Sequence, residues 1–416
     1  MKYKERLLTP RLQRLVQNFP VVVVSGARQV GKSTLLNHVF PAGTDCVVFD
    51  PVIDVENARQ DPDLFLDNHP ATPLLLDEIQ YAPELVAAIK RRVDRDRKPG
   101  QFVLTGSQQW EVMKSLAESL AGRAVFIEMD GFSLAEMSGW AEGAGWLFSW
   151  LEDPEGFVHR EHGLIELEYT LYETLWRGFL PDATTLPIEV VADFHEAYIK
   201  TYIERDVRLL ADVSEWQTFS RFIRLAAALT AQEINYSQLG REIGIAPQTA
   251  RRWLDMLKAT FQWFDVPAFS GNNIKRVSSK PKGFVADTGF ACAAQRISSP
   301  VALAGHPMLG ALFETAVFAE IRKQSALLSP APQLYHWRSA GGAEVDLLLE
   351  RDGKLFPIEI KVKSQPARRD VRGIKALRNS YPAMDIQPGL VIAPTRKFMK
   401  LSDDAWAMPW NMKEQG

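Results

Sequence analysis

The hydrophobic pattern of the first 135 residues predicts an α/β domain. Short, unbroken aliphatic runs alternate with stretches of helical period over this region. Such runs are typical of strands that are buried on both faces of a parallel sheet, with the intervening helices covering those faces. The predicted strands are Val21 to Val24, Cys46 to Phe49, Leu74 to Leu76, Phe102 to Leu104 and Val125 to Ile127.

The pattern changes twice after residue 135. Residues 136–275 have mostly helical period, which predicts a helical connector at 136–215 and a helical module at 216–275. A turn is predicted inside the connector, at Asp153-Pro154-Glu155-Gly156. Helix, strand and hairpin signals return over residues 276–416 and predict a further α/β domain. The fold class is therefore α/β, with several domains.

Length and composition agree with a folded multidomain protein. The chain has 416 residues, of which 46% are hydrophobic and 24% are charged, as in ordinary globular proteins. No apolar run approaches the roughly 18 residues that a membrane-spanning helix requires. The amino terminus lacks the apolar stretch of a secretory signal, and the two cysteines, Cys46 and Cys292, are too few for a disulfide framework. These features predict a cytoplasmic protein without membrane contact.

Charge is segregated along the chain, although the net charge is only -3. Eleven carboxylates accompany a single arginine between Glu128 and Glu173, whereas ten Lys or Arg accompany two Asp between Lys361 and Lys400. The basic stretch is a candidate for contact with nucleic-acid phosphates, which the acidic stretch would repel. Each stretch is also compatible with an ordinary solvated surface, so charge alone does not identify a partner.

Residues 26–33 carry the strongest chemical signal. They read G-A-R-Q-V-G-K-S, which matches G-x-x-x-x-G-K-[ST], and they lie between a buried strand and a helical stretch from Thr34 to Phe40. Backbone N–H groups of such a loop surround phosphate oxygens, Lys32 reaches the β- and γ-phosphates, and Ser33 can bind Mg²⁺. The sequence therefore predicts a site for ATP and Mg²⁺. Its predicted nucleotide-binding residues are Gly26, Ala27, Arg28, Gln29, Val30, Gly31, Lys32, Ser33 and Thr34.

Polar residues follow two further strands of the predicted sheet. Asp77 and Glu78 come directly after one strand, and Ser107 follows another. Because the carboxyl ends of parallel strands meet at one edge, Asp77 is predicted to hold the Mg²⁺ shell and Glu78 to polarise an attacking water. This pair favours hydrolysis over phosphoryl transfer to a substrate. Ser107 is a candidate sensor of the γ-phosphate or, equally, the cap of the next helix.

A helix-turn-helix pattern lies in the helical module. Ser237 to Ile243 predicts a short helix that Gly244 stops, and Gln248 to Leu257 predicts a second helix after Pro247. The second helix has a polar side that fits a DNA major groove. That side consists of Gln248, Thr249, Arg251 and Arg252.

A wing is predicted after the second helix. It runs from Thr260 through a turn at residues 270–273 to a strand from Ile274 onward, where Lys275 and Arg276 could meet phosphates. Winged helices either read DNA or dock protein, and the pattern leaves both roles open.

Charged residues recur on a predicted β-hairpin in the last domain. Two strand patterns flank a turn at residues 351–354. Strand period two puts Glu359 and Lys361 on one face, and hairpin pairing can bring Asp346 beside them. Two carboxylates and a lysine in this arrangement can bind a divalent metal and orient water, with Glu314 as an extra ligand. An alternating hairpin with charged residues on its solvated face is the alternative.

This arrangement resembles the D…E-x-K core of restriction-endonuclease-like folds. The resemblance implies such a fold for residues 276–416, with a metal site formed by Asp346, Glu359 and Glu314 and with Lys361 beside it. Val345 stands where many such nucleases have Pro, a departure that affects the turn more than the metal site. These folds also persist as binding modules, so the resemblance does not establish cleavage.

Seven short motifs along nearly the whole chain resemble a large prokaryotic family of AAA-type ATPases. The C-terminal half of that family is catalogued only as a domain of unknown function. The resemblance implies an AAA+ fold with nucleotide sites near subunit boundaries, and hence a homo-oligomer. It also makes Arg123 a candidate arginine finger for a neighbouring subunit, with an ordinary surface arginine as the alternative. The motifs are G-A-R-Q-V-G-K-S at 26–33, L-D-E-I-Q at 76–80, L-T-G-S at 104–107, L-A-G-R at 120–123, Y-I-E-R-D-V at 202–207, D-T-G-F at 287–290 and G-A-E-V-D at 342–346.

Together these features predict a Mg²⁺-dependent ATPase coupled to a winged-helix module and a nuclease-like domain, acting on DNA or a DNA-associated complex. The alternative is an ATP-dependent protein-interaction switch or remodeller whose nuclease-like domain is inactive. A small-molecule kinase is a more distant alternative, because Glu78 favours hydrolysis. The predicted catalytic residues are Lys32, Glu78, Ser107, Arg123 and Lys361.

Overall fold

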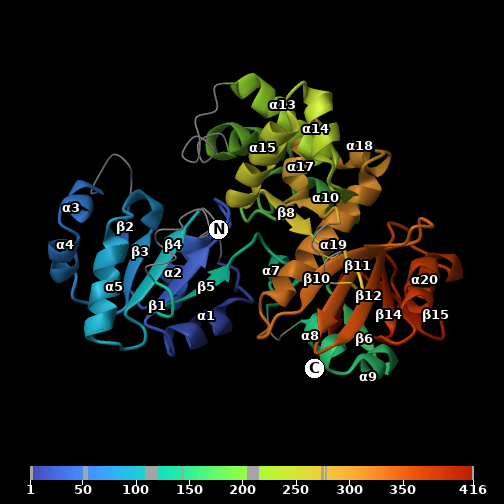
Figure 1. The fold of residues 1–416 in the computed structure, drawn as a ribbon, viewed down its shortest axis with the longest axis horizontal. Helices are drawn as coiled ribbons and strands as arrows, with labels where there is room; N and C mark the ends of the chain where they lie inside the picture. Colours follow the sequence, from blue (N-terminus) through green and yellow to red (C-terminus); the bar gives the residue numbers. More distant parts are fainter. Residues whose placement is uncertain are drawn as a thin grey trace.

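The structure is a computed structural model that describes residues 3–49, 55–107, 120–141, 145–203, 215–272, 276 and 279–414. Two sheet-containing parts lie at opposite ends of the molecule in Figure 1, and a group of helices lies above and between them. The amino-terminal sheet is drawn in blue and cyan, and the carboxyl-terminal sheet in orange and red. Within the described ranges, no helix combines the length and the apolar character needed to cross a bilayer.

All five aliphatic runs of the amino-terminal region form strands of one parallel sheet, as predicted. The strand order is β2-β3-β4-β1-β5, and every pairing in it is parallel. The residues that follow β1, β3 and β4 therefore meet at one edge. The strands are β1 (Val21–Ser25), β2 (Cys46–Val48), β3 (Leu74–Asp77), β4 (Phe102–Gly106) and β5 (Ala124–Glu128), and the helices of this part are α1 (Thr9–Val16), α2 (Lys32–Val39), α3 (Val55–Gln60), α4 (Pro62–Asn68) and α5 (Leu85–Arg95).

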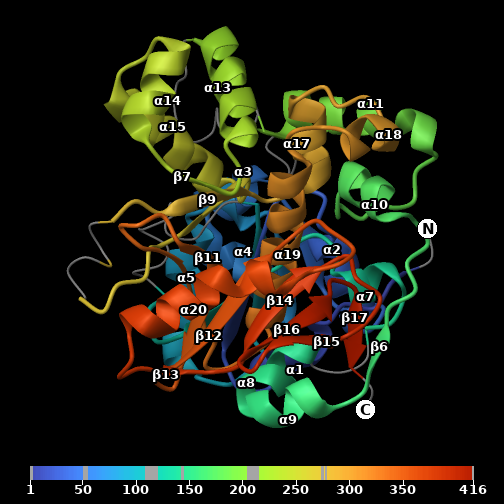
Figure 2. The same ribbon diagram turned by 90° about the vertical axis from the view of Figure 1, so that its right-hand side faces the viewer.

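The connector divides between two parts of the molecule. Its first half packs on the carboxyl-terminal part, and Figure 2 shows α8 and α9 beside the strands of that part. There β6 pairs with β17, and the ring centroids of Trp150 and Phe356 lie 5.3 Å apart. Its second half packs against α17. The connector elements are α7 (Leu134–Met137), α8 (Trp146–Glu152), α9 (Pro154–His159), β6 (His162–Leu164), α10 (Leu171–Arg177) and α11 (Ile188–Tyr198). The elements that they contact are α17 (Thr288–Ala294) and β17 (Met412–Glu414).

The turn predicted at residues 153–156 is wrong. Asp153 instead caps α9, because its side chain accepts a hydrogen bond from the N–H of Gly156 at 2.9 Å. Pro154 occupies the first turn of this helix, where its missing N–H costs nothing. Residues typical of a turn therefore mark a helix start here.

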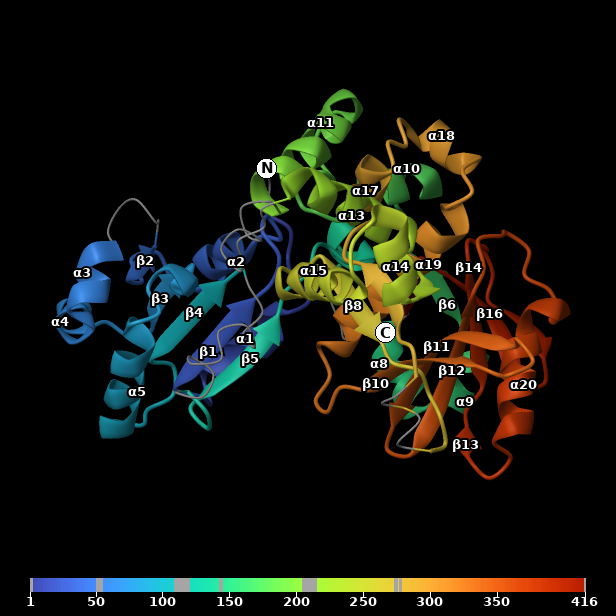
Figure 3. The same cartoon turned by 45° about the horizontal axis from the view of Figure 1, so that its top comes forward.

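The two helices of the predicted helix-turn-helix form where the sequence predicts them. α14 ends at Gly244, whose φ of 81° is in the left-handed region, and α15 begins at Pro247. A sheet of order β7-β9-β8 accompanies the pair, and α15 and β8 lie between the two larger sheets in Figure 3. The elements are α13 (Trp216–Ala228), β7 (Gln232–Glu233), α14 (Tyr236–Ile243), α15 (Pro247–Ala259), β8 (Trp263–Val266) and β9 (Lys282–Val285).

The strand that returns from the predicted wing is β9, which begins at Lys282. Ile274 and Lys275, where the sequence predicts that strand, lie outside the described residues. Since β9 pairs with both β7 and β8, the small sheet joins residues on both sides of the predicted boundary at 275/276.

The carboxyl-terminal part is a mixed sheet with helices on it. Its strand order is β10-β11-β12-β14-β16-β15, in which β10, β11 and β12 pair antiparallel and β12, β14 and β16 pair parallel. The predicted hairpin is present as β11 and β12. The elements are α18 (Pro300–Ala304), α19 (Leu309–Ser325), β10 (Gln333–Arg338), β11 (Glu344–Arg351), β12 (Lys354–Ile360), α20 (Arg372–Ser380), β13 (Asp385–Ile386), β14 (Gly389–Ala393), β15 (Met399–Ser402) and β16 (Ala405–Pro409).

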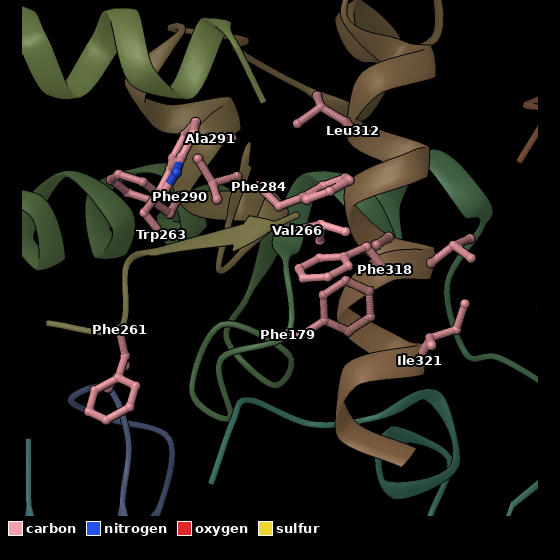
Figure 4. Close-up of a cluster of buried hydrophobic side chains, with 14 of the residues drawn as sticks. Phe179, Phe261, Trp263, Val266, Phe284, Phe290, Ala291, Leu312, Phe318 and Ile321 are labelled. Carbon is pink, nitrogen blue, oxygen red and sulfur yellow. The ribbon is translucent and has the colours of Figure 1, made fainter. Parts of the chain in front are cut away.

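Helix α19 lies at the centre of a core that the parts share. The rings of Phe318 on α19 and Phe284 on β9 stack with centroids 4.1 Å apart, and Figure 4 shows Phe179 beside them. One continuous cluster of buried apolar side chains includes Val24 of the amino-terminal sheet and Leu347 of the carboxyl-terminal sheet. Burial of this shared apolar surface holds the parts together.

Candidate functional site

The loop of residues 26–31 connects β1 to α2 in the conformation that its glycines permit. Gly26 has φ 155° and Gly31 has φ 95°, and a Cβ on Gly26 would overlap the carbonyl oxygen of Met129. Nη1 of Arg6 donates a hydrogen bond to the carbonyl oxygen of Val30 at 2.8 Å. The loop is therefore held by contacts at both of its ends, with its backbone at the start of α2.

Lys32 is the first residue of α2, and its side chain is buried. Lys32 is 5% exposed, and its Nζ donates hydrogen bonds to the carbonyl oxygens of Gly26 and Ala27, each at 2.9 Å. The ammonium group thus lies inside the loop that the sequence assigns to phosphate binding.

Ser33 and Asp77 meet as predicted, although they are far apart in sequence. The Ser33 hydroxyl donates a hydrogen bond to Oδ2 of Asp77 at 2.5 Å. The other carboxylate oxygen of Asp77 accepts a hydrogen bond from Thr105. Thr105 was missed as a site residue, although its place at the tip of β4 beside Ser107 is a signal that could have found it.

Glu78 and Ser107 are joined through Gln80. Glu78 has φ 59°, a left-handed conformation that is uncommon for a residue with a side chain, and its N–H donates to Oγ1 of Thr105 at 3.2 Å. The side-chain amide of Gln80 donates hydrogen bonds to the Glu78 carboxylate and, at 3.2 Å, to Oγ of Ser107. Gln80 was also missed, and residues 108–119, where Ser107 would cap a helix, lie outside the described residues.

Arg123 lies at the amino-terminal end of the parallel strands, opposite the end that carries the loop of residues 26–31. It precedes β5, whose first residue pairs with Val21 at the start of β1, whereas the loop follows the end of β1. Its guanidinium pairs with the Asp94 carboxylate through two hydrogen bonds of 2.5 and 2.9 Å. Arg123 therefore cannot serve the loop of its own chain, and a finger role requires a neighbouring subunit.

The charged residues predicted in the carboxyl-terminal domain also come together. Nζ of Lys361 lies 3.0 Å from Asp346 Oδ2 and 2.8 Å from Glu359 Oε2. The N–H of Ile360 donates to Asp346 Oδ2 at 2.8 Å. Asp346 and Glu359 are each 3% exposed, so this is a buried cluster and not the solvated face of a hairpin.

Lys282 is a further member of this cluster that the sequence did not indicate. It extends from β9, forms an ion pair with Glu314 on α19 and lies 3.6 Å from Oδ1 of Asp346. The Lys/Pro-rich stretch around it has the composition of a linker. We call Glu314, Asp346, Glu359, Lys282 and Lys361 the carboxylate cluster.

Burial and charge set the protonation of this cluster. Burial, with the neighbouring Asp346 charge, raises the pKa of Glu314 to about 8 and that of Glu359 to about 8. Burial also acts to raise the pKa of Asp346, but Lys361 and Lys282 outweigh it and lower that pKa below its ordinary value. Asp346 is therefore the carboxylate of this cluster whose ionised form is most favoured.

The described residues include no group of three or more His, Cys, Asp or Glu arranged to hold a metal ion. The predicted metal set of Asp346, Glu359 and Glu314 thus does not form an open metal site in this arrangement. The physical reason is that the ammonium groups of Lys282 and Lys361 lie against the carboxylate oxygens.

Two hollows on the carboxyl-terminal part carry basic side chains. A hollow of about 830 Å³ is lined by Arg368, Lys375 and Lys400, among others. A second, of about 450 Å³, shares Lys400 and includes Arg396. Asp403 and Asp404 also line the first hollow, so its charge is partly offset.

Comparison with known proteins identifies the parts of the chain. Residues 18–138 match the model of a family described as AAA domain. Residues 168–301 and 309–412 match two models described as domains of unknown function, DUF8612 and DUF4143. The chain therefore contains an AAA-type P-loop domain that two domains of unknown function follow, which is the domain order that the resemblance implies.

Its relatives include uncharacterized proteins. One from Mycobacterium tuberculosis and one from Mycobacterium bovis are each 29% identical over 411 residues, which cover 98% of this chain and 84% of each relative. Among solved structures, a Walker-type ATPase of Pyrococcus abyssi has a TM-score of 0.37 and 15% identity, covering 69% of this chain and 94% of its own. The RuvB Holliday junction branch migration motor of Thermotoga maritima has a TM-score of 0.29 and 13% identity, covering 64% of this chain and 90% of its own.

Proposed function

We propose that this chain binds ATP with Mg²⁺ at the loop of residues 26–33 and hydrolyses it. The observation that carries the proposal is the meeting of Ser33 and Asp77, 2.5 Å apart, beside the buried ammonium of Lys32. A hydroxyl and a carboxylate at the tip of a buried strand are oxygen donors of the kind that suit Mg²⁺. Mg²⁺ held by Ser33 and Asp77 would offset the negative charge of the phosphate oxygens.

The residues of the chain supply position and proton transfer. Lys32 can turn its N–H groups from the carbonyl oxygens of Gly26 and Ala27 to phosphate oxygens bound by the same loop. Glu78 accepts a proton from the attacking water, and Gln80 fixes the carboxylate for that task. Thr105 orients Asp77 by occupying the oxygen that does not face Ser33.

Two substitutions separate nucleotide binding from hydrolysis. Lys32→Ala should weaken ATP binding and turnover together, whereas Glu78→Gln should retain binding and lower kcat by about 100-fold or more, because it removes only the base. The measurements are ATP affinity by fluorescence titration and steady-state phosphate release. Glu84→Gln is the matched control, since Glu84 pairs with Arg59 away from the loop and its loss should leave both values unchanged. Full turnover by Glu78→Gln would exclude the proposed role.

We also propose that the loop of residues 26–33, which we call the nucleotide loop, is coupled to the helical module. Oη of Tyr198 donates a hydrogen bond to the carbonyl oxygen of Arg28 at 3.4 Å, and Nε2 of Gln262 donates to that Oη at 3.0 Å. The N–H of Ala286, which follows β9, donates to the carbonyl oxygen of Gln262 at 3.0 Å. This buried chain of contacts supports transmission of loop movement to the small sheet.

The helical module is proposed to be a winged helix that contacts DNA. Its order of α13, β7, α14, α15, β8 and β9 with a three-stranded sheet supports the winged-helix assignment. On α15, Arg251 and Arg252 are exposed while Trp253 and Leu254 are buried, so the polar side of this helix faces away from the core. Guanidinium groups on an exposed helix face suit contact with phosphates and base edges.

The last domain is proposed to be nuclease-like. Support comes from α19, the strands β10 to β12, α20 and β14 following one another around the carboxylate cluster. The basic hollows with Lys375 and Lys400 would add a sequence-independent attraction for phosphates. The alternative remains an ATP-dependent protein-interaction switch or remodeller, which the acidic connector beside this domain favours.

The DNA proposal is tested by ATPase rates with single-stranded, duplex and branched DNA. We expect DNA to stimulate turnover, and we expect Arg251→Ala with Arg252→Ala to weaken DNA binding and flatten its salt dependence, because phosphate contacts release counterions. Arg221→Ala on α13 is the matched control, since it removes an exposed arginine outside the helix-turn-helix pair. Salt-insensitive binding and unstimulated turnover would favour the protein-interaction alternative.

A further inference from the structure

The carboxylate cluster contains a cation from another part of the molecule. Glu314 and Asp346 belong to α19 and β11, whereas Lys282 belongs to β9 of the small sheet. Lys282 is 8% exposed, and its ammonium lies in ion-pair contact with Glu314 and 3.6 Å from Asp346. A buried lysine that reaches two carboxylates on separate elements is positioned by packing, because its flexible side chain would otherwise stay in solvent.

The cluster needs this charge to remain buried. Lys361 supplies one positive charge to Asp346 and Glu359, and Lys282 supplies a second to Glu314 and Asp346. Buried carboxylates without compensating charge are strongly unfavourable. Glu314 meets this charge through Oε1, which is in contact with the Lys282 ammonium.

We propose that the Lys282 ammonium occupies the cation position between Glu314 and Asp346, so that a divalent cation binds there only after β9 withdraws this side chain. The inference rests on the proposal that the last domain is nuclease-like, which takes the cluster as a divalent-cation site, and it adds the regulation of that site. It also explains why three carboxylates come together without forming an open metal site. A single ammonium group competes with a divalent cation for the same oxygens, because like charges cannot share them.

Withdrawal of Lys282 requires movement of the small sheet. Lys282 pairs in register with Glu233 of β7 and Val266 of β8, and a Cβ on the next residue, Gly283, would overlap the ring of Trp263. The Lys282 backbone is therefore held on both sides by the small sheet. The cluster thus acts as a clasp between the helical module and the carboxyl-terminal domain, and opening the clasp exposes the cation position.

The experiment measures Mn²⁺ binding to the full chain without nucleotide, by electron paramagnetic resonance of unbound Mn²⁺. Lys282→Gln should bind one additional Mn²⁺ at least about ten-fold more tightly than the unmodified protein, because the competing charge is gone. Adding Asp346→Asn to Lys282→Gln should abolish this gain. Lys258→Gln is the matched control, because it removes another ion-paired lysine of the helical module outside the cluster and should bind Mn²⁺ like the unmodified protein.

Two further measurements keep the inference testable if Lys282→Gln does not fold. Lys282→Met preserves side-chain length and should show the same gain. In the unmodified protein, Mn²⁺ at millimolar concentration should raise hydrogen exchange at the β9 amides, because cation binding displaces Lys282. Equal Mn²⁺ affinity with and without Lys282, or bound Mn²⁺ with unchanged β9 exchange, would overturn the inference. A Lys282 variant that binds Mn²⁺ but cleaves no DNA would support the clasp and exclude only the nuclease proposal.

Discussion

Gln80 shows how one side chain organises the proposed hydrolytic site. Its amide donates to the carboxylate of Glu78 and to the hydroxyl of Ser107, so it connects the tips of β3 and β4. Glu78 adopts a left-handed backbone conformation at this place, with φ 59°. Such a conformation costs free energy and persists because neighbouring contacts determine it. The position of the proposed base therefore depends on a neutral neighbour that itself transfers no proton.

Gln80→Leu should lower kcat for ATP hydrolysis about ten-fold while changing the KM for ATP little. The physical reason is that a misplaced base loses proton-transfer efficiency without altering phosphate contacts. Steady-state phosphate release over a range of ATP concentrations measures both values. Gln60→Leu is the control, because Gln60 donates to Glu56 on an exposed helix and should behave like the unmodified protein. An equal loss in kcat and in ATP affinity would indicate a structural role for Gln80 instead.

At the scale of secondary-structure elements, helix α19 connects the AAA domain to the last domain. Glu314 near its start lies in the carboxylate cluster. Arg322 near its end pairs with Glu128, the last residue of β5, and with Asp130 beyond that strand. Between them, Glu320 accepts a hydrogen bond from the N–H of Leu134 at 3.1 Å. Because a helix is stiff along its axis, α19 offers the proposed coupling a second path between the AAA domain and the cluster.

Glu320→Gln should remove the decrease in the free energy of unfolding that the buried Glu320 carboxyl group causes as pH rises. Burial raises the pKa of Glu320 above its ordinary value of 4.5, against the opposing effect of Lys323. The folded state therefore keeps a proton that the unfolded state has released, and the free energy of unfolding falls as pH rises from 4.5 through the folded-state pKa. Glutamine retains an oxygen for the Leu134 N–H, so the variant should gain stability relative to the unmodified protein as pH rises.

Urea denaturation at several pH values between about 5 and 8 measures this difference. Burial lowers the pKa of Lys323 against the opposing charge of Glu320, so removing that charge lowers the lysine pKa further and adds to the variant's gain in stability as pH rises. The exposed Glu189 serves as the control, and Glu189→Gln should follow the unmodified protein at every pH. A difference between Glu320→Gln and the unmodified protein that stays constant with pH would contradict the assignment.

At the scale of the whole molecule, the two ends of the parallel strands in the amino-terminal sheet have different proposed roles. The nucleotide loop follows β1 at one end, while Arg123 precedes β5 at the other. At about 3.3 Å per residue, a strand of this length separates the two ends by roughly 15 Å. An arginine finger at Arg123 therefore demands that one subunit present this end to the loop of the next, as in a head-to-tail ring.

Mixing two inactive variants tests this assembly. Arg123→Ala and Lys32→Ala should each be inactive alone, and their mixture should recover part of the ATPase activity, because some interfaces combine an intact loop with an intact finger. Specific activity should also rise with protein concentration. Arg97→Ala is the control, because Arg97 donates to the carbonyl of Gly122 at the same end and should remain active. Activity that does not depend on concentration, with no recovery on mixing, would leave Arg123 as the partner of Asp94 alone.

Local patterns in the sequence determined much of the secondary structure of this protein and the position of its nucleotide loop. The strands β1 to β5, the helices α14 and α15 and the β11–β12 hairpin each follow from the spacing of apolar, Gly and Pro residues among close neighbours in the chain. The nucleotide loop is equally local, because eight consecutive residues define it. Asp77 could be placed beside Ser33 because parallel strands bring their carboxyl ends to one edge. Chain-neighbour geometry and strand direction suffice for such inferences.

The tertiary structure decided what depends on partners distant in sequence. Asp153 resembled a turn residue until packing of α8 and α9 on the carboxyl-terminal sheet made it a helix cap. Gln80 has no pattern of its own, and its role follows only from the adjacency of β3 and β4. Lys282 lies in a linker-like stretch, yet the small sheet carries its charge into contact with α19 and β11. The energy of a buried ion pair depends on which groups are brought together in space, and this information is absent from any local stretch of sequence.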